Sequence, residues 1–140
     1  MSDEATPLIP TTTSSTTNRR STRNNNRNMY WTLGCVYGAS AVAIAAYGAH
    51  GLKKIVPDPA KIASFGTAAH YQLIHSLVLL LATRAAPENK LAANLFTAGM
   101  TMFSGSVYAL VLDPARFRFL GPVTPLGGLC LMGGWVALAF

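Results

Sequence analysis

The chain has 140 residues, of which 51% are hydrophobic and only 11% are charged. This composition, with a mean hydropathy of +0.32, excludes an ordinary soluble domain and is typical of a membrane protein. The net charge of +6 would also suit a nucleic-acid-binding protein, but the basic residues are spread over the N-terminal segment and short loops. Lysine and arginine beside membrane spans explain the excess more simply, so the sequence predicts no nucleic-acid partner.

Residues 1–28 are polar and of low complexity, with a Ser/Thr run followed by four arginines among asparagines. Such a segment cannot bury enough apolar surface to offset the entropy lost on ordering, so it is predicted to be a disordered tail. Within it, Glu4 precedes Leu8 and Ile9 in a pattern that resembles an acidic dileucine sorting signal. The pattern predicts a sorting adaptor as partner and an endomembrane or vacuole-like location, with a chance match as the alternative interpretation.

The mitochondrial inner membrane is the alternative location. Residues 5–28 hold four arginines and no acidic residue, as a mitochondrial presequence would. Against this, Asp3 and Glu4 stand at the front, and no amphipathic apolar stripe accompanies the arginines. The endomembrane location is therefore favoured.

Four apolar segments follow, at about residues 29–49, 62–83, 91–112 and 119–140. Each is long enough to cross a bilayer at about 1.5 Å of rise per residue. The first connection contains Pro57 and Pro59, and Asp58 is placed to cap the second helix. Because the loops are short, neighbouring spans should run antiparallel, with both chain ends on one side. The predicted fold is an all-α four-helix transmembrane bundle over residues 29–140, preceded by the disordered polar tail.

Small residues recur along the first and third spans at helical spacing. Gly34 and Gly38 form a GxxxG spacing, which lets helix backbones approach closely in lipid. Packing within the chain is the favoured interpretation of this pair, and homodimerisation is the alternative. In the third span, Thr97, Thr101 and Gly105 form a similar stripe, which is predicted to pack against the polar face of the second span.

The fourth span opens with Pro122 and Pro125, which predict a broken or irregular first turn. The glycines beside them are predicted helix-packing residues, as are two glycines at the end of the first span and a tryptophan further along the fourth. These residues are Gly48, Gly51, Gly127, Gly128 and Trp135.

Polar side chains stand at the head of the otherwise apolar second span. Tyr71 and His75 are four residues apart and Gln72 and His75 three apart, so a helix places all three on one face. Polar groups inside a membrane normally face other helices or a cavity. The sequence therefore predicts a polar cluster of these three residues, with His50 as a further candidate; His70 lies off to the side of that face.

Several motifs carry a resemblance to a known family. They are Tyr47-Gly48-Ala49-His50-Gly51-Leu52-Lys53, then Tyr71-Gln72 with His75, then Thr124-Pro125-Leu126-Gly127-Gly128 ahead of Gly134-Trp135. In this order and spacing, over roughly residues 34–140, they resemble the transmembrane protein 256-like family, also catalogued as domain of unknown function 423. The resemblance implies four membrane helices and no agreed activity. The positions it carries over are Gly48, His50, Gly51, Tyr71, Gln72, His75, Gly127, Gly128 and Trp135, whereas His70 is not one of them.

Enzymatic and metal chemistry find little support in the sequence. No carboxylate or cysteine accompanies the three histidines at a metal-ligand spacing. Ser76 follows His75 directly, so the two side chains should point in different directions on a helix. The sequence predicts that the protein is not an enzyme and holds no metal or cofactor.

The predicted function is a structural, assembly or adaptor component of a membrane, and a small dimeric transporter using an intramembrane histidine is the alternative. Proton-coupled exporters usually need a buried carboxylate. Here every acidic residue lies in the N-terminal tail or a loop, namely Asp3, Glu4, Asp58, Glu88 and Asp113. Histidine could titrate instead, which keeps transport open. The predicted partners are the lipid bilayer and either a second copy of the chain or another membrane protein.

Overall fold

The computed structural model describes residues 14–140, with side chains described from Met29 onward. This part of the chain is helical and contains no strand. Its elements are α1 Ser14–His50, the 3₁₀-helix η1 Leu52–Lys54, α2 Pro59–Ala85, α3 Lys90–Leu112, the 3₁₀-helix η2 Arg118–Leu120 and α4 Val123–Ala139. The predicted all-α fold with four candidate membrane spans is confirmed, because four helical stretches are long and apolar enough to cross a bilayer.

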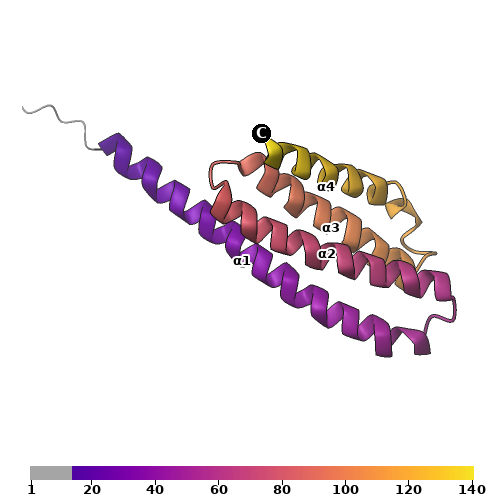
Figure 1. Cartoon of the computed structure of the whole chain (residues 1–140). Coiled ribbons are helices and arrows are strands. Elements are labelled where there is room, and N and C mark those ends of the chain that lie inside the picture. The colour runs from indigo at the N-terminus through magenta and orange to yellow at the C-terminus, as the bar shows by residue number, and fades with distance from the viewer. Residues whose placement is uncertain (1–13) are drawn as a thin grey trace, which may run out of the picture.

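The start of α1 differs from the prediction. The helix begins at Ser14, so residues 14–28 are helical where the sequence predicts disorder. No proline or glycine interrupts this stretch, so nothing in its backbone stops the helix from extending out of the apolar span. In Figure 1 this part of α1 projects beyond the other helices. The sorting pattern of Glu4, Leu8 and Ile9 lies outside the described residues.

Local chemistry sets the helix starts. Asp58 caps α2, since its side chain accepts a hydrogen bond of 2.9 Å from the backbone of Ala60. Asn89 does the same for α3, accepting from Ala92 at 3.0 Å. The predicted irregular start of the fourth span is confirmed: η2 and a turn precede α4, which begins only at Val123.

The helices follow one another in space as they do in the sequence, with α2 and α3 as the central pair and α1 and α4 outside them (Figure 1). Two hydrogen bonds reach directly from α1 to α3: the Tyr30 hydroxyl donates to Asn94 at 2.6 Å, and the Tyr37 hydroxyl pairs with that of Thr101. From Tyr30 to Tyr37 along α1, the partner on α3 also moves forward, from Asn94 to Thr101, so α1 and α3 run parallel. α2 runs antiparallel to both.

Both ends of the membrane domain lie on the same side of the bundle. At the start of the apolar part of α1, the ring of Trp31 lies 4.5 Å from the Arg84 guanidinium carbon at the end of α2. At the end of α4, the carbonyl of Ala137 accepts a hydrogen bond from Asn89, the residue that caps α3. This arrangement confirms the predicted up-down-up-down topology.

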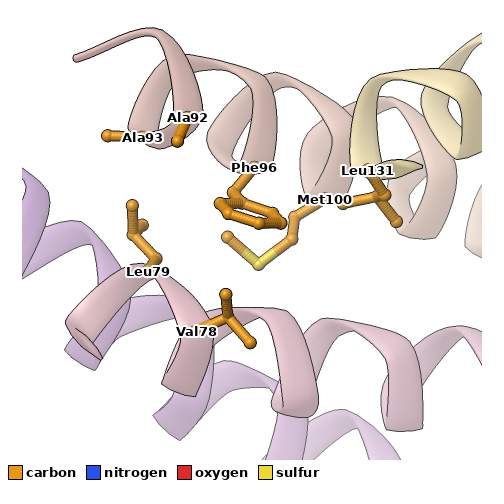
Figure 2. Close-up of a cluster of buried hydrophobic side chains, with 7 residues drawn as sticks. All are labelled: Val78, Leu79, Ala92, Ala93, Phe96, Met100 and Leu131. Atoms are coloured by element: carbon orange, nitrogen blue, oxygen red, sulfur yellow. The ribbon is translucent and has the colours of Figure 1, made fainter. Parts of the chain in front are cut away.

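Two apolar clusters fill the interior. The larger, drawn in Figure 2, lies between α2, α3 and α4 and consists of Val78, Leu79, Ala92, Ala93, Phe96, Met100 and Leu131. The smaller lies toward the η1 end and consists of Leu52, Val56, Phe65 and Val111. Lipid tails are as apolar as these side chains, so association between the helices depends on close packing and hydrogen bonds.

Glycines bring α1 close to α2. A Cβ atom at Gly34 would lie 2.7 Å from the Leu80 side chain, and one at Gly38 would lie 3.2 Å from the Ser76 hydroxyl. At the other end of the helix, a Cβ at Gly48 would lie 2.9 Å from the Phe65 ring. The GxxxG pair therefore packs within the chain, as the favoured interpretation predicts, and α2 covers the face that homodimerisation through it would need.

Close approach is tighter still between α3 and α4. A Cβ at Gly127 would lie 2.8 Å from the Phe103 Cα, and it would clash with the backbone nitrogen of the same residue. Gly134 lies similarly close to the Phe96 ring, and Gly99 to Leu131, at 2.8 and 2.7 Å. Backbone cannot move aside as a side chain can, so Gly127 holds the closest contact of this pair of helices.

Three predicted packing glycines behave differently. Gly105 is exposed, and no atom lies within 4 Å of the Cβ it would carry, so the prediction that it packs is wrong. No neighbouring helix lies against α3 at Gly105, and Gly99 makes the close contact with α4 instead. A Cβ at Gly128 would make only an ordinary contact of 3.9 Å with Phe103, and Gly51 packs on Tyr47, in the preceding turn.

Candidate functional site: two polar clusters

Gln72 joins three helices in the centre of the bundle. Its side chain is only 4% exposed. The amide nitrogen donates to the Tyr37 carbonyl at 3.0 Å and to the Ser40 hydroxyl at 2.8 Å, both on α1. The amide oxygen accepts from the Tyr108 hydroxyl of α3 at 3.0 Å. Both donor hydrogens and the acceptor of the carboxamide are thus used. We call Gln72, Tyr37, Ser40 and Tyr108 the Gln72 cluster.

Further polar contacts surround this cluster. One turn before Tyr108, Ser104 donates to the Ala68 carbonyl at 3.0 Å and so joins α3 to α2. Within the described part of the chain, no buried side-chain nitrogen or oxygen is without a hydrogen-bond partner. Buried polar groups that all find partners stabilise one arrangement of helices over others.

His75 forms a second centre on the same helix and is 6% exposed. Its Nδ1 lies 2.7 Å from the Tyr71 carbonyl, one turn earlier. Its Nε2 lies 3.3 Å from the indole nitrogen of Trp135 on α4. An indole N–H can only donate, so Nε2 accepts, and Nδ1 must carry the proton that it donates to the carbonyl. The contacts therefore fit a neutral imidazole in a single tautomer.

Aromatic rings enclose this imidazole. The rings of Tyr71, Phe96 and Trp135 lie 5.7, 5.9 and 6.3 Å from it between centroids. Tyr71 also packs on Phe103 of α3 at 5.1 Å. We call His75, Tyr71, Phe96 and Trp135 the His75 cluster. The His75 cluster links α2, α3 and α4 mainly through ring contacts. Such contacts favour offset or edge-to-face geometry over face-to-face stacking.

The prediction of one polar cluster is therefore wrong. Gln72 faces α1 and α3, whereas His75 faces α4, because three residues along a helix still leave about 60° between two side chains. Tyr71 is 44% exposed and joins His75 through its ring and carbonyl. His50 is exposed at the end of α1 and belongs to neither cluster.

The threonines of α3 also take a different place from the predicted one. Thr97 and Thr101 donate back to their own helix, to Ala93 and Thr97 carbonyls at 2.8 Å each. Thr101 then meets Tyr37 of α1 and not the polar face of α2. The contact between α3 and α2 is made by Ser104 instead. Of the predicted stripe, Thr101 contacts α1, whereas Gly105 has no atom within 4 Å of the Cβ it would carry.

Sequence reasoning missed the partners that complete the two clusters. These are Tyr37, Ser40 and Tyr108 around Gln72, and Phe96 around His75. One signal was present: Thr97, Thr101, Ser104 and Tyr108 recur at intervals of four, three and four residues, which places them along one side of α3.

Metal binding gains no support from the described residues, where no three His, Cys, Asp or Glu side chains gather at one point. His70 is exposed, His75 is enclosed by rings, and His50 lies at the end of another helix. Of the two cysteines, Cys35 is exposed and Cys130 is half-buried.

Comparison with known proteins places this chain in a family. The family model described as "Protein of unknown function (DUF423)" matches residues 44–128, which run from the end of α1 to the start of α4. The chain belongs to this family. The resemblance carried by the His50, Gln72 and Gly127 motifs is thereby confirmed. No solved structure matches the chain.

Relatives in this family are named UPF0382 membrane proteins. One from Schizosaccharomyces pombe is 37% identical over 114 residues, which cover 77% of this chain and 96% of the relative. One from Haemophilus influenzae is 35% identical and covers 81% and 93% of the two chains. The Bacillus subtilis relative YwdK is 32% identical, with 76% and 89% covered. With four candidate spans and relatives of this name, the chain is an integral membrane protein.

Proposed function

We propose that the protein is a structural or assembly component of its membrane. The observation that carries this proposal is the closed Gln72 cluster, in which one carboxamide ties α1, α2 and α3 together with every polar atom in use. A site for a changing cargo needs polar groups that are free to exchange partners. A fully paired centre suits a fixed scaffold, whose outer helices α1 and α4 leave large surfaces for lipid or neighbouring proteins.

A small transporter that uses His75 is the second candidate function. The specific observation in its favour is an imidazole enclosed within the membrane domain. To take a proton at Nε2, His75 would have to lose its contact with the indole of Trp135, because that group cannot accept. Transport would therefore require the side chains of His75 and Trp135 to separate, which the scaffold proposal does not.

The proposal assigns no enzymatic step to the protein. Ser76 is the nearest hydroxyl to His75 in sequence, but it donates to the Leu73 carbonyl at 2.7 Å and faces Gly38 of α1. The imidazole faces α4 on another side of the helix. A serine and a histidine that point apart do not form a nucleophile and base pair.

The proposed location is an endomembrane or vacuole-like membrane, with the mitochondrial inner membrane as the alternative. The support is the pattern of Glu4, Leu8 and Ile9 in the sequence, which would bind a sorting adaptor from the cytosol. Replacing Leu8 and Ile9 together with alanine should redistribute a fluorescently tagged protein. An unchanged location in the double variant, or co-fractionation of the native protein with respiratory membranes, would contradict this assignment.

Purification of the full chain in mild detergent tests the function itself. A scaffold is expected to co-purify with other membrane proteins in fixed proportion. Gln72→Leu is expected to lose them, while Gly105→Ala, at an exposed position on α3, keeps them. A parallel assay measures proton flux into liposomes that contain the purified protein. Flux that depends on His75, with no co-purifying protein, would establish the transporter and overturn the scaffold.

A further inference from the structure

The outer side of α2 carries a histidine without a partner. His70 is exposed and makes no hydrogen bond or ring contact with another described residue. It lies between Lys61 and Arg84, the nearest charged residues along the helix. At about 1.5 Å per residue these flanking charges are about 14 and 21 Å away, so the imidazole lies at a depth where hydrocarbon surrounds the helix. A polar ring there needs a partner from outside the protomer.

His70 is also part of a regular line of exposed residues. The line follows α2 at intervals of four, three, four, three and four residues, and its members are Ala63, Thr67, His70, Ile74, Leu77 and Leu81. We call these six residues the His70 seam. Alternating intervals of three and four are the spacing with which two helices wind around each other. Beside the seam, Gly66 has no atom within 4 Å of the Cβ it would carry, so another helix can approach closely.

We propose that the His70 seam is the interface of a parallel homodimer, in which α2 of one copy packs against α2 of its partner. A second copy fits the seam chemically, since a neutral imidazole holds one donor and one acceptor and can therefore form a hydrogen bond with the same residue of its partner. No charged residue between Lys61 and Arg84 would repel the same surface. A single polar position within an apolar seam also fixes the register of the two helices.

The proposed interface differs from the one that dimerisation through the glycine pair of α1 would use. Gly34 and Gly38 lie against Leu80 and Ser76, so that face is already occupied by α2 of the same copy. The opposite side of α2 is the one left open. The inference stands independently of the scaffold proposal, because a dimer could serve a scaffold or a transporter.

Disulfide cross-linking in native membranes tests the interface. In a chain with Cys35→Ala and Cys130→Ala, a cysteine replaces Leu77 in the seam. Matched controls carry the cysteine at Val42 on α1 or Met132 on α4, since the three side chains are 60, 59 and 59% exposed. Mild oxidation is expected to give a covalent dimer several-fold more abundant for Leu77→Cys than for either control. Equal yields, or a cross-link to a protein of different mass, would overturn the proposal.

A second measurement isolates the histidine. Sedimentation equilibrium in density-matched detergent compares His70→Leu with His50→Leu, the same change at another exposed histidine outside the seam. From the strength of interhelical hydrogen bonds in membranes, we expect His70→Leu to weaken the dimer about tenfold. His50→Leu is expected to leave the dimer unchanged. Circular dichroism first establishes that both variants keep their helices. A monomeric wild-type protein, or an equally strong His70→Leu dimer, would contradict the proposal.

Discussion

The two junctions of the bundle are held by different means. Between α1, α2 and α3, long polar side chains of the Gln72 cluster reach across and hydrogen-bond. Between α3 and α4, the backbones themselves come close, and glycines such as Gly127 make room for them. In lipid no hydrophobic force selects one helix partner over another, so each junction needs its own source of specificity. The junction between α3 and α4 depends mainly on shape. The junction of α1 with α2 and α3 adds donor and acceptor positions to the glycine contacts between α1 and α2.

The stability of the junction between α3 and α4 should be the more sensitive of the two to the addition of a single methyl group. Gly127→Ala would place a Cβ against the Phe103 backbone, which cannot rotate away. Forced overpacking of this kind should destabilise the protein by about 3 kcal/mol. Gly105→Ala is the matched control on α3, with open space around the new atom, and should change stability by less than about 0.5 kcal/mol. Unfolding by SDS in bicelles, followed by circular dichroism, measures both. Equal effects of the two substitutions would remove the distinction between shape and hydrogen bonding.

The second largest loss of stability is expected from a substitution in the Gln72 cluster, which joins α1, α2 and α3. Gln72→Leu keeps the volume but removes the bonds to Tyr37, Ser40 and Tyr108. At the modest strength measured for interhelical bonds in membranes, the expected loss is about 2 kcal/mol in the same unfolding assay. Leu129→Ala on the exposed side of α4 is the control and should be nearly neutral. A Gln72→Leu protein as stable as the wild type would mean that packing alone holds α1 in place.

The features that could be predicted from the sequence are those that depend on residues close together in the chain. Local patterns predicted the spans, the Asp58 cap and the intramolecular role of Gly34 and Gly38, because each depends on residues close together in the chain. The neighbour that each side chain meets depends on how the helices are rotated against one another. That rotation separates Gln72 from His75 and makes Gly99, rather than Gly105, the packing glycine of α3. No local pattern contains it.

His75 offers a smaller effect that also separates the two candidate functions. His75→Leu should cost about 1–2 kcal/mol, because it removes the partner of the Trp135 indole and the donor to the Tyr71 carbonyl. His75→Gln still donates and accepts, so it should lose less stability and rescue the phenotype of a deletion strain. Stability is measured by SDS unfolding, and rescue by growth. A stable His75→Gln protein that fails to rescue would defeat the scaffold proposal and favour a proton-handling role.

The smallest effect is expected from Trp135→Phe. Phenylalanine keeps an aromatic ring against His75 and Phe96 but removes the N–H that points at Nε2. Because that bond is long at 3.3 Å and Trp135 is partly exposed, its loss should cost about 0.6 kcal/mol. Nitrogen-15 NMR of labelled histidine should show a neutral ring with the proton on Nδ1 in the wild type, since the indole leaves Nε2 only the role of acceptor. In the scaffold proposal the variant gains no proton flux in liposomes. If His75 carries protons instead, removal of the indole N–H frees Nε2 and should raise that flux. In the unfolding assay, a loss of stability larger than that of Gln72→Leu would show that α4 depends on this one hydrogen bond.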